Sequence, residues 1–294
     1  MEKIKRIGWI GIGKMGLPMA SHILKEGFEL SVFDIDPRPC EVMRQRGAKI
    51  ANSINSLSNG CQVIVSILPN DHTVETVAGQ LLAQIGKDVI FLEMSTISPK
   101  SSSRVAEMAD MYSVSYLRAP VSGTVGNAEA RSLTAMVSGP REAYDRCQSL
   151  FGAFCKKHFY LGSEEEARWM KLVVNLQVGA LAAALGEGLT MGRAGGLDWE
   201  IMLEVLEQSV VSSPLLKVKL PFLLRRDFTP AFTAKQMSKD FDLILDAMSE
   251  TCSVGAMACW IRQLLTAMQA CGLGENDYFG CVEIYENLAG LKKS

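Results

Sequence analysis

A glycine-rich turn near the N-terminus constrains the fold of this chain more than any other feature. An apolar run over residues 5–10 leads into Gly11-Ile12-Gly13-Lys14-Met15-Gly16, and a helical pattern follows over residues 15–26. In such a strand–turn–helix unit the first glycine permits the tight turn, the second lets a ligand approach the backbone, and the third lets the helix pack on the strand. The turn therefore predicts a dinucleotide site, with the diphosphate at the helix N-terminus.

The first half of the chain alternates short β-branched runs with helical patterns. Strands are predicted at residues 5–10, 29–34, 62–68, 89–93, 114–117, 133–137 and 158–161. Helices are predicted at residues 15–26, 37–46, 73–85, 99–111 and 142–154. This alternation is typical of an α/β Rossmann domain, a doubly wound, mostly parallel sheet with helices on both faces.

The pattern changes near residue 164, after which no convincing strand is found. Residues 165–193 read as one long helix, apolar nearly all round, which predicts a helix in the middle of a bundle. Further helices are predicted at residues 199–208, 214–224, 233–249, 254–271 and 278–288. Since 294 residues suit two domains, we predict a Rossmann domain over residues 1–163 and an all-α domain over residues 164–294.

Composition excludes several classes of protein. The chain has 30 Lys and Arg against 32 Asp and Glu, so its charge gives no reason to expect binding to nucleic acid or to an anionic membrane. The apolar stretch over residues 172–185 is shorter than the ~20 residues of a membrane span. Eight cysteines without a C-x-x-C pair, and no signal-peptide pattern, favour reduced thiols in the cytoplasm. With three histidines, none at ligand spacing from a cysteine, we expect no metal site.

Asp34 closes the second predicted strand, 21 residues after Gly13. An acid about 20 residues beyond the glycine turn hydrogen-bonds the adenosine ribose and repels a 2′-phosphate, so the residue favours NAD over NADP. Arg38 follows closely and leaves NADP possible. The alternative is a surface aspartate beside an ordinary turn.

Three later segments follow strands and are expected at the ligand-binding edge of the sheet. They are Leu68-Pro69, Ser95-Thr96 and Ala119-Pro120-Val121-Ser122-Gly123. In the last of them a hydroxyl and free backbone N–H groups suit a small anion. The alternative interpretation of each segment is an ordinary turn that binds no ligand.

Lys171 and Asn175 lie four residues apart in the long helix and so share one face. A lysine in a dry cleft gives up its charge more readily, which suits proton transfer near neutral pH. A neighbouring amide can orient a hydroxyl or carbonyl. Taken alone, the pair also fits a lysine that extends to solvent beside a helix asparagine, and Lys239-Asp240 fits a solvated helix face.

In this order the segments resemble the β-hydroxyacid dehydrogenase family, over nearly the whole chain. The shared segments are residues 10–20, 68–70, 94–99 and 119–123, Lys171 with Asn175, Lys239-Asp240, and Gly272-Leu273-Gly274-Glu275-Asn276-Asp277. The resemblance implies a Rossmann domain joined to an all-α domain that serves substrate binding and oligomerisation, with the active site between them. Members commonly form homodimers or homotetramers.

The resemblance also implies site residues. Lys171 would be the general acid/base and Asn175 its orienting amide, both touching substrate, while Ser122, Gly123 and the adjacent Thr124 would hold the substrate carboxylate. The cofactor-binding residues would be Gly11, Ile12, Gly13, Lys14, Met15, Gly16, Asp34, Leu68, Pro69, Thr96 and Lys239. The expected reaction moves a hydride between NAD, or possibly NADP, and a short 3-hydroxy acid or its semialdehyde.

Several residues depart from the family pattern on the expected substrate side. Arg118 stands in place of an aspartate, Thr124 and Arg131 in place of glycines, and Glu165-Glu166-Ala167 in place of a Gly-Ala-Gly lead into the long helix. Arg118 or Arg131 would either bind a second acidic group of the substrate or lie on the surface as ordinary arginines. Two rival functions remain open: an imine reductase, whose members usually lack the lysine, and a dinucleotide-binding protein without catalysis.

Overall fold

The chain forms two structural units. The computed structural model describes residues 4–291, and the contacts among them divide the chain into Met1–Lys171 and Leu172–Ser294. The first unit is built on a sheet. The described part of the second unit, residues 172–291, consists of helices and loops, with an isolated bridge between Thr233 and Asp277.

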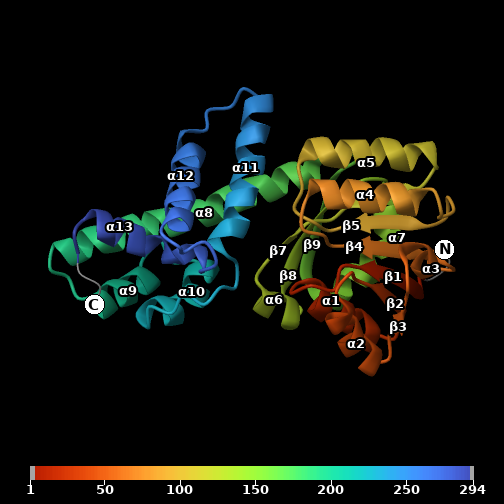
Figure 1. Ribbon diagram of the computed structural model, residues 1–294, viewed down its shortest axis with the longest axis horizontal. Helices are drawn as coiled ribbons and strands as arrows, with labels where there is room; N and C mark the ends of the chain where they lie inside the picture. Colours follow the sequence, from red (N-terminus) through yellow and green to blue (C-terminus); the bar gives the residue numbers. More distant parts are fainter. Residues whose placement is uncertain (1–3, 292–294) are drawn as a thin grey trace. The chain divides into compact units, whose positions relative to one another are not determined.

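The N-terminal unit contains a nine-stranded sheet (Figure 1). Its strands are β1 (Arg6–Ile10), β2 (Glu29–Phe33), β3 (Lys49–Ile50), β4 (Val63–Ser66), β5 (Ile90–Glu93), β6 (Ser115–Arg118), β7 (Val121–Ser122), β8 (Leu133–Ser138) and β9 (Cys155–Gly162). The order is β3-β2-β1-β4-β5-β6-β8-β7, with β9 paired to β8. Pairing is parallel from β3 to β6, antiparallel at β6–β8 and β7–β8, and parallel again at β8–β9. The chain changes direction across the sheet at β1, so a crevice is expected where β1 ends.

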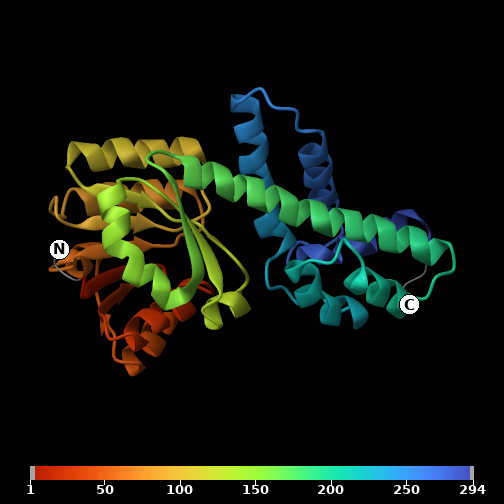
Figure 2. The same cartoon turned by 180° about the vertical axis from the view of Figure 1, so that it is seen from behind.

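Helices cover both faces of this sheet. They are α1 (Gly16–Lys25), α2 (Pro37–Gln45), α3 (Ile54–Ser58), α4 (Asp71–Leu82), α5 (Pro99–Met111), α6 (Val125–Glu129) and α7 (Arg141–Phe154). One buried cluster joins the sheet to α1, α2 and α7, and another joins it to α3, α4 and α5. Figure 1 shows α4 and α5 together on one face, and Figure 2 shows α7 on the other. The predicted doubly wound Rossmann sheet is confirmed.

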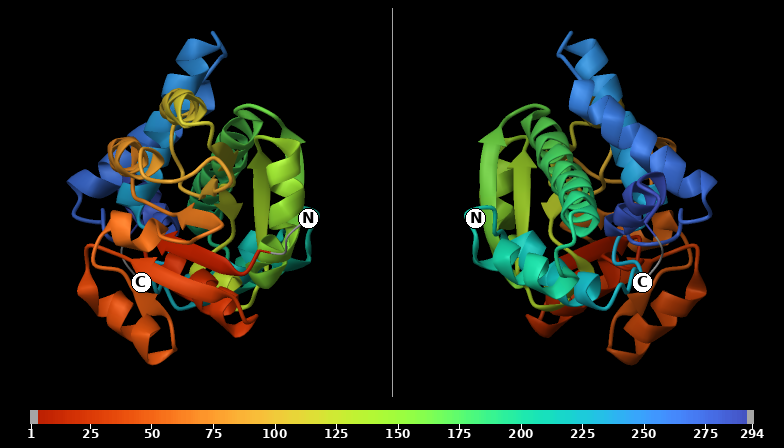
Figure 3. Two further views of the ribbon diagram at one scale, coloured as in Figure 1. Left: turned by 90° about the vertical axis from the view of Figure 1, so that its right-hand side faces the viewer. Right: turned by 90° about the vertical axis from the view of Figure 1, so that its left-hand side faces the viewer.

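The C-terminal unit is all-α, as predicted. Its helices are α8 (Glu166–Ala194), whose first turns belong to the N-terminal unit, α9 (Trp199–Gln208), α10 (Pro214–Leu224), α11 (Ala234–Glu250), α12 (Ala256–Ala270), the short 3₁₀ helix η1 (Tyr278–Cys281) and α13 (Val282–Leu288). Helices α11 and α12 run side by side (Figure 3). Glycines on α8 allow aromatic rings to approach its backbone: a Cβ on Gly179 would lie 2.4 Å from the Phe241 ring, and one on Gly186 would lie 2.9 Å from Tyr285.

The predicted long central helix is found as α8, and it is partly buried. Val173 is 52% exposed and Met191 is 74% exposed, because the described residues cover only part of this helix. Over an 18-residue window α8 has a mean hydropathy of 1.5, enough by length and composition for a membrane span, and 44% of that window is buried. A long core helix passes the same test, so this property alone says little about a membrane.

Candidate active site

The glycine turn after β1 has the backbone geometry that the motif predicts. Gly11 has a φ of +91°, and a Cβ there would lie 2.2 Å from the carbonyl oxygen of Ile67. A Cβ on Gly16 would lie 2.0 Å from the carbonyl oxygen of Gly11. Nothing lies within 4 Å of a Cβ on Gly13, so the turn leaves space at its middle glycine. Because this space lies beside the N-terminus of α1, the turn fits a dinucleotide diphosphate.

Asp34, directly after β2, is hydrogen-bonded to the turn. Its Oδ2 accepts from the Ile12 N–H at 2.6 Å, and its Oδ1 accepts from the Asp36 N–H at 2.8 Å. Each carboxylate oxygen has a further lone pair, so the residue can still accept hydroxyl groups. Arg38 forms a forked ion pair with Asp36, with Nη2 2.6 Å from Oδ2. The hydrogen bonds and the charge of Arg38 lower the pKa of Asp36, so its carboxylate stays ionised and paired.

The remaining cofactor candidates of the N-terminal unit follow neighbouring parallel strands. Leu68 and Pro69 come after β4, and Thr96 comes after β5. The Leu68 N–H donates to the Ser95 Oγ at 2.7 Å, so the two loops are joined to each other. Lys14 and Met15 belong to the glycine turn itself, after β1. Since β1, β4 and β5 are adjacent and parallel, these residues lie along one edge of the sheet.

The predicted substrate loop contains β7 and the residues that follow it. Gly123 has a φ of +137°, and a Cβ there would lie 2.7 Å from the Leu133 side chain, so glycine is required. Ser122 directly precedes it. Thr124 is the N-cap of α6: its N–H and its hydroxyl both donate to the Asn127 Oδ1, at 2.9 Å each. Both polar groups of Thr124 therefore serve the helix that follows the loop.

Lys171 reaches this substrate loop within the N-terminal unit. Its Nζ donates to the carbonyl oxygen of Val121 at 2.8 Å, the residue directly before Ser122. The amine therefore lies beside the proposed carboxylate-binding residues, where it can exchange a proton with a bound hydroxyl or carbonyl group.

The C-terminal unit brings Asn175 and Lys239 to one aspartate. The Asn175 Nδ2 donates to the Asp240 Oδ2 at 2.6 Å, and the Lys239 Nζ lies 3.0 Å from the Asp240 Oδ1. Asp240 is 2% exposed, so it holds both side chains from a buried position. The sequence pattern had marked Asp240 only as the neighbour of Lys239. Its contact with α8 joins residues 65 positions apart, which no local pattern indicates.

Each arginine singled out by the sequence is paired with a glutamate. Arg118 is buried at the end of β6, where its Nη2 pairs with the Glu165 Oε1 at 2.6 Å. Arg131, with a φ of +55°, pairs with Glu26 at 2.6 Å and donates from Nε to the His22 Nδ1 at 3.1 Å. For Arg118 the alternative of an ordinary surface arginine is wrong, because the residue is buried. Two departures from the family pattern, Arg118 and Glu165, are partners in one ion pair.

Sequence reasoning also missed a buried ion pair between Glu93 and Arg168. Glu93 is 0% exposed and Arg168 is 1% exposed. The apolar setting of both residues was the only available signal, because a charged residue inside an apolar run needs a partner.

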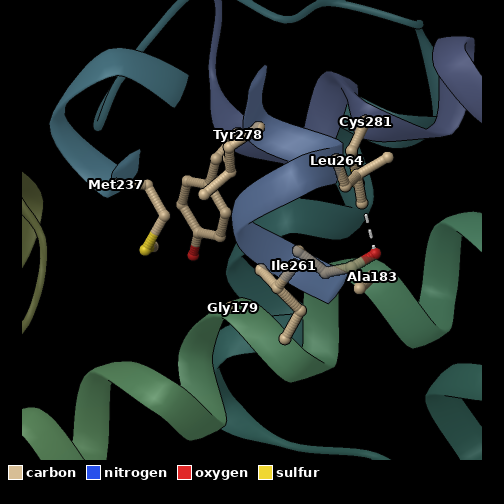
Figure 4. A pocket seen from close by; sticks show the side chains of 9 residues that line it. Gly179, Ala183, Met237, Ile261, Leu264, Tyr278 and Cys281 are labelled. Atoms are coloured by element: carbon tan, nitrogen blue, oxygen red, sulfur yellow. Dashed lines mark hydrogen bonds between the residues drawn. The ribbon is translucent and has the colours of Figure 1, made fainter. Parts of the chain in front are cut away.

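The C-terminal unit contains a small cavity. It has a volume of about 10 Å³ and lies among Gly179, Ala183, Met237, Ile261 and Tyr278 (Figure 4). At most one water fits such a volume, and the lining is largely apolar.

Known proteins match both halves of the chain. The family model described as the NAD binding domain of 6-phosphogluconate dehydrogenase matches residues 6–162. The model described as NAD-binding of NADP-dependent 3-hydroxyisobutyrate dehydrogenase matches residues 166–285. The chain is 31% identical to 2-(hydroxymethyl)glutarate dehydrogenase of Eubacterium barkeri, over 100% of this chain and 99% of that protein. It is 32% identical to 3-hydroxyisobutyrate dehydrogenase of Pseudomonas aeruginosa, over 86% of this chain and 89% of that protein.

Solved structures give the same fold. The Mycobacterium tuberculosis 3-hydroxyisobutyrate dehydrogenase with L-serine superposes with a TM-score of 0.88 at 22% identity, covering 96% of this chain and 99% of that one. An imine reductase from Pseudomonas sp. is more distant, with a TM-score of 0.64 at 19% identity, covering 96% of this chain and 99% of that one. At these identities the likeness concerns the fold alone.

Proposed function

This chain belongs to the β-hydroxyacid dehydrogenase family, and we propose that Lys171 is the general acid/base of an NAD(P)-dependent reaction on a short 3-hydroxy acid or its semialdehyde. The observation that carries the proposal is the bond from the Lys171 Nζ to the Val121 carbonyl, directly before Ser122. It brings a proton-transfer group to a loop with hydroxyl and N–H donors. An imine reductase is the weaker candidate, because its solved examples are more distant and the lysine is present.

The cofactor would be held by residues that follow four adjacent strands, β2, β1, β4 and β5, and by Lys239 of α11. The glycine turn from Gly11 to Gly16 would hold the diphosphate, and Asp34 the adenosine ribose. Leu68, Pro69, Thr96 and Lys239 would contact the rest of the molecule. When bound, the nicotinamide accepts the hydride in oxidation of the hydroxy acid and donates it in reduction of the aldehyde.

The chain's own residues would hold the substrate and move one proton. The Ser122 hydroxyl and the Gly123 N–H would bind the carboxylate, and Thr124 would support them by capping α6. In oxidation Lys171 would take the proton of the substrate hydroxyl on Nζ, and in reduction it would return that proton to the carbonyl oxygen. Asn175, held by Asp240, would orient the same oxygen.

We further propose that the substrate carries a single carboxylate. Arg118 and Arg131, the two extra cations near the loop, are each paired with a glutamate. A second acidic group would therefore have to compete with an existing ion pair. Serine, glycerate and 3-hydroxyisobutyrate meet this condition in oxidation, and succinic semialdehyde meets it in reduction.

The test is a panel of rates with NAD(H) and with NADP(H). It contains the four compounds above, together with 2-(hydroxymethyl)glutarate and sulfonated analogues. Turnover of one or more monocarboxylates at the highest kcat/KM is the expected result. Selective turnover of the dicarboxylate would contradict the single-carboxylate proposal, and silence toward every compound despite NADH binding would favour a non-catalytic binding protein.

We also propose a soluble protein in the cytoplasm. All eight cysteines are free thiols in the structure, with Cys252, Cys259 and Cys271 exposed, which suits a reducing compartment. Fractionation of cells that express the tagged chain tests this: recovery with membranes or in an oxidising compartment would contradict the proposal.

A further inference from the structure

Two buried ion pairs lie side by side where β5 and β6 end and α8 begins. Glu93 pairs with Arg168, and Arg118 pairs with Glu165 at 2.6 Å. Glu93 and Arg118 face each other in the register of β5 and β6, while Glu165 and Arg168 lie on either side of the first residue of α8. Side-chain exposure is 0% for Glu93, 1% for Arg168, 5% for Arg118 and 12% for Glu165.

The Glu93–Arg168 pair has several further hydrogen-bond partners. Besides the Glu93 carboxylate, the Arg168 guanidinium donates to the Ser95 carbonyl at 2.7 Å, the Tyr116 hydroxyl at 3.1 Å and the Ser102 hydroxyl at 3.2 Å. Burial alone disfavours its charge, but Tyr116 and Glu93 outweigh burial and raise the pKa of Arg168 above its ordinary value. The guanidinium therefore stays charged and fixed in one orientation.

Stability does not explain such a pair. Taking two charges out of water costs several kcal/mol for each ion, and an apolar pair of similar volume is often equally stable. What a buried pair with many hydrogen bonds does supply is a defined position for the two segments that it joins. The question is therefore which segments those are.

One of the joined segments comprises the loops after β4 and β5. The Ser95 N–H and hydroxyl both donate to the Glu93 Oε1, and the Ser95 Oγ in turn accepts the Leu68 N–H at 2.7 Å. A continuous chain of hydrogen bonds thus runs from Leu68 through Ser95 and Glu93 to Arg168. Leu68 and Thr96, the residue after Ser95, are proposed cofactor contacts.

The other joined segment is the start of α8. Arg168 lies three residues, about one turn, before Lys171. The Lys171 Nζ then reaches the Val121 carbonyl. The second ion pair ties Glu165 to Arg118, which leads directly into this substrate loop.

From these contacts we propose that Glu93 and Arg168 are positioning residues. They hold Lys171 in a fixed position relative to the loops after β4 and β5. The proposal rests on the function proposed above, in that Lys171 is taken as the acid/base. The pair acts through the first turn of α8, which carries Arg168 and leads to Lys171. A displacement of about 1 Å at a reacting group can cost 10²-fold in rate.

The test is the double variant Glu93→Gln/Arg168→Met, which removes both charges together and leaves no unpaired buried ion. The matched control is Glu75→Gln/Arg104→Met, which removes an exposed ion pair between α4 and α5 in the same unit. Circular dichroism and urea unfolding check that both double variants fold. We expect kcat of the buried-pair variant to fall on the order of 10–10²-fold, with NADH Kd and substrate KM within about threefold. We expect Arg168→Lys, which keeps the charge, to retain more activity than Arg168→Met.

A second measurement is independent of turnover. An amine-acylating reagent followed by mass spectrometry gives the labelling rate of Lys171, with the exposed Lys156 as internal reference. Faster labelling of Lys171 in the buried-pair variant, but not in the control, is expected because Nζ is less firmly held at Val121. A folded variant with wild-type kcat and wild-type Lys171 labelling would overturn the proposal. If the wild-type protein turns over no substrate, faster Lys171 labelling in the buried-pair variant would support the positioning role and reject the proposed function.

Discussion

At the scale of single residues, the three glycines of the first turn carry different constraints. Gly11 and Gly16 are required by the protein's own backbone, whereas the space beside Gly13 is open. The same change from glycine to alanine should therefore impair cofactor binding at Gly13 and stability at Gly16.

We expect Gly13→Ala to leave the unfolding free energy of the cofactor-free protein within about 0.5 kcal/mol of wild type, while NADH affinity falls at least tenfold because the Cβ occupies the diphosphate's place. We expect Gly16→Ala to cost about 1–3 kcal/mol of stability, since its Cβ collides with backbone. Urea unfolding and NADH titration of both variants are the measurements. If Gly13→Ala binds NADH with wild-type affinity, the glycine turn does not bind the cofactor diphosphate.

We propose that Asp34 determines the preference for NAD over NADP. We expect Asp34→Ala to narrow the ratio of NAD to NADP affinity, because the charge that repels a 2′-phosphate is lost. Arg38→Gln is the control, and its effect should be small because Arg38 is held by Asp36. Calorimetric titration with both oxidised cofactors gives the ratios; an unchanged ratio in Asp34→Ala would exclude Asp34 from specificity.

The residues that sequence patterns revealed were those with a local signature. The glycines, Asp34 and the Lys171–Asn175 spacing are visible within a strand, a turn or a helix. The roles of Glu93, Arg118, Glu165 and Asp240 depend on partners 47 to 75 positions away, and no spacing rule covers such pairs. Arg118 was misassigned for this reason, because a lone arginine shows no partner in the sequence.

At the scale of elements, α8 depends on glycines where aromatic side chains cross it. We expect Gly179→Ala to destabilise the protein by about 1–3 kcal/mol, since the new Cβ would lie 2.4 Å from the buried Phe241 ring. Gly188→Ala on the same helix meets nothing within 4 Å and should be neutral or stabilising by up to about 1 kcal/mol. Urea unfolding gives the stability of the two variants. Equal unfolding free energies would mean that the Phe241 ring moves aside at no cost, which would contradict the prediction.

Elements of ordinary length were predictable and the shortest were not. The helix predicted at residues 99–111 is found at Pro99–Met111, since a Pro and a serine cap mark its start. The two-residue strands β3 and β7 and the five-residue helices α3 and α6 are too short for a periodic pattern to show. Residues 278–288, predicted as one helix, form η1 and then α13.

At the scale of the whole molecule, the C-terminal unit leaves apolar side chains uncovered. Exposed residues on α9, α10 and the adjoining loops include Leu197, Ile201, Val205, Val210, Val211, Val218 and Phe222. Exposed apolar surface of this kind is typical of a protein–protein interface. We propose that it forms part of a homodimer or homotetramer contact.

We expect light scattering after size-exclusion chromatography to give a dimer or tetramer for the wild type. Ile201→Lys/Val205→Lys should shift the mass toward the monomer, because both residues are 60% exposed on one face of α9 and burying a charge there is costly. Met111→Lys, at an exposed apolar residue of the N-terminal unit, should not change the mass. A wild-type monomer at micromolar concentration would contradict the proposal.

The central claim is that Lys171 moves the proton in a dehydrogenase reaction. The most direct measurement compares Lys171→Ala with wild type for NADH binding and for kcat on the best substrate of the panel, with Lys156→Ala as an exposed control. We expect NADH Kd to be unchanged and kcat to fall by ~10²–10⁴, the usual contribution of a general acid/base. A variant that binds NADH and keeps a rate close to wild type would contradict the claim.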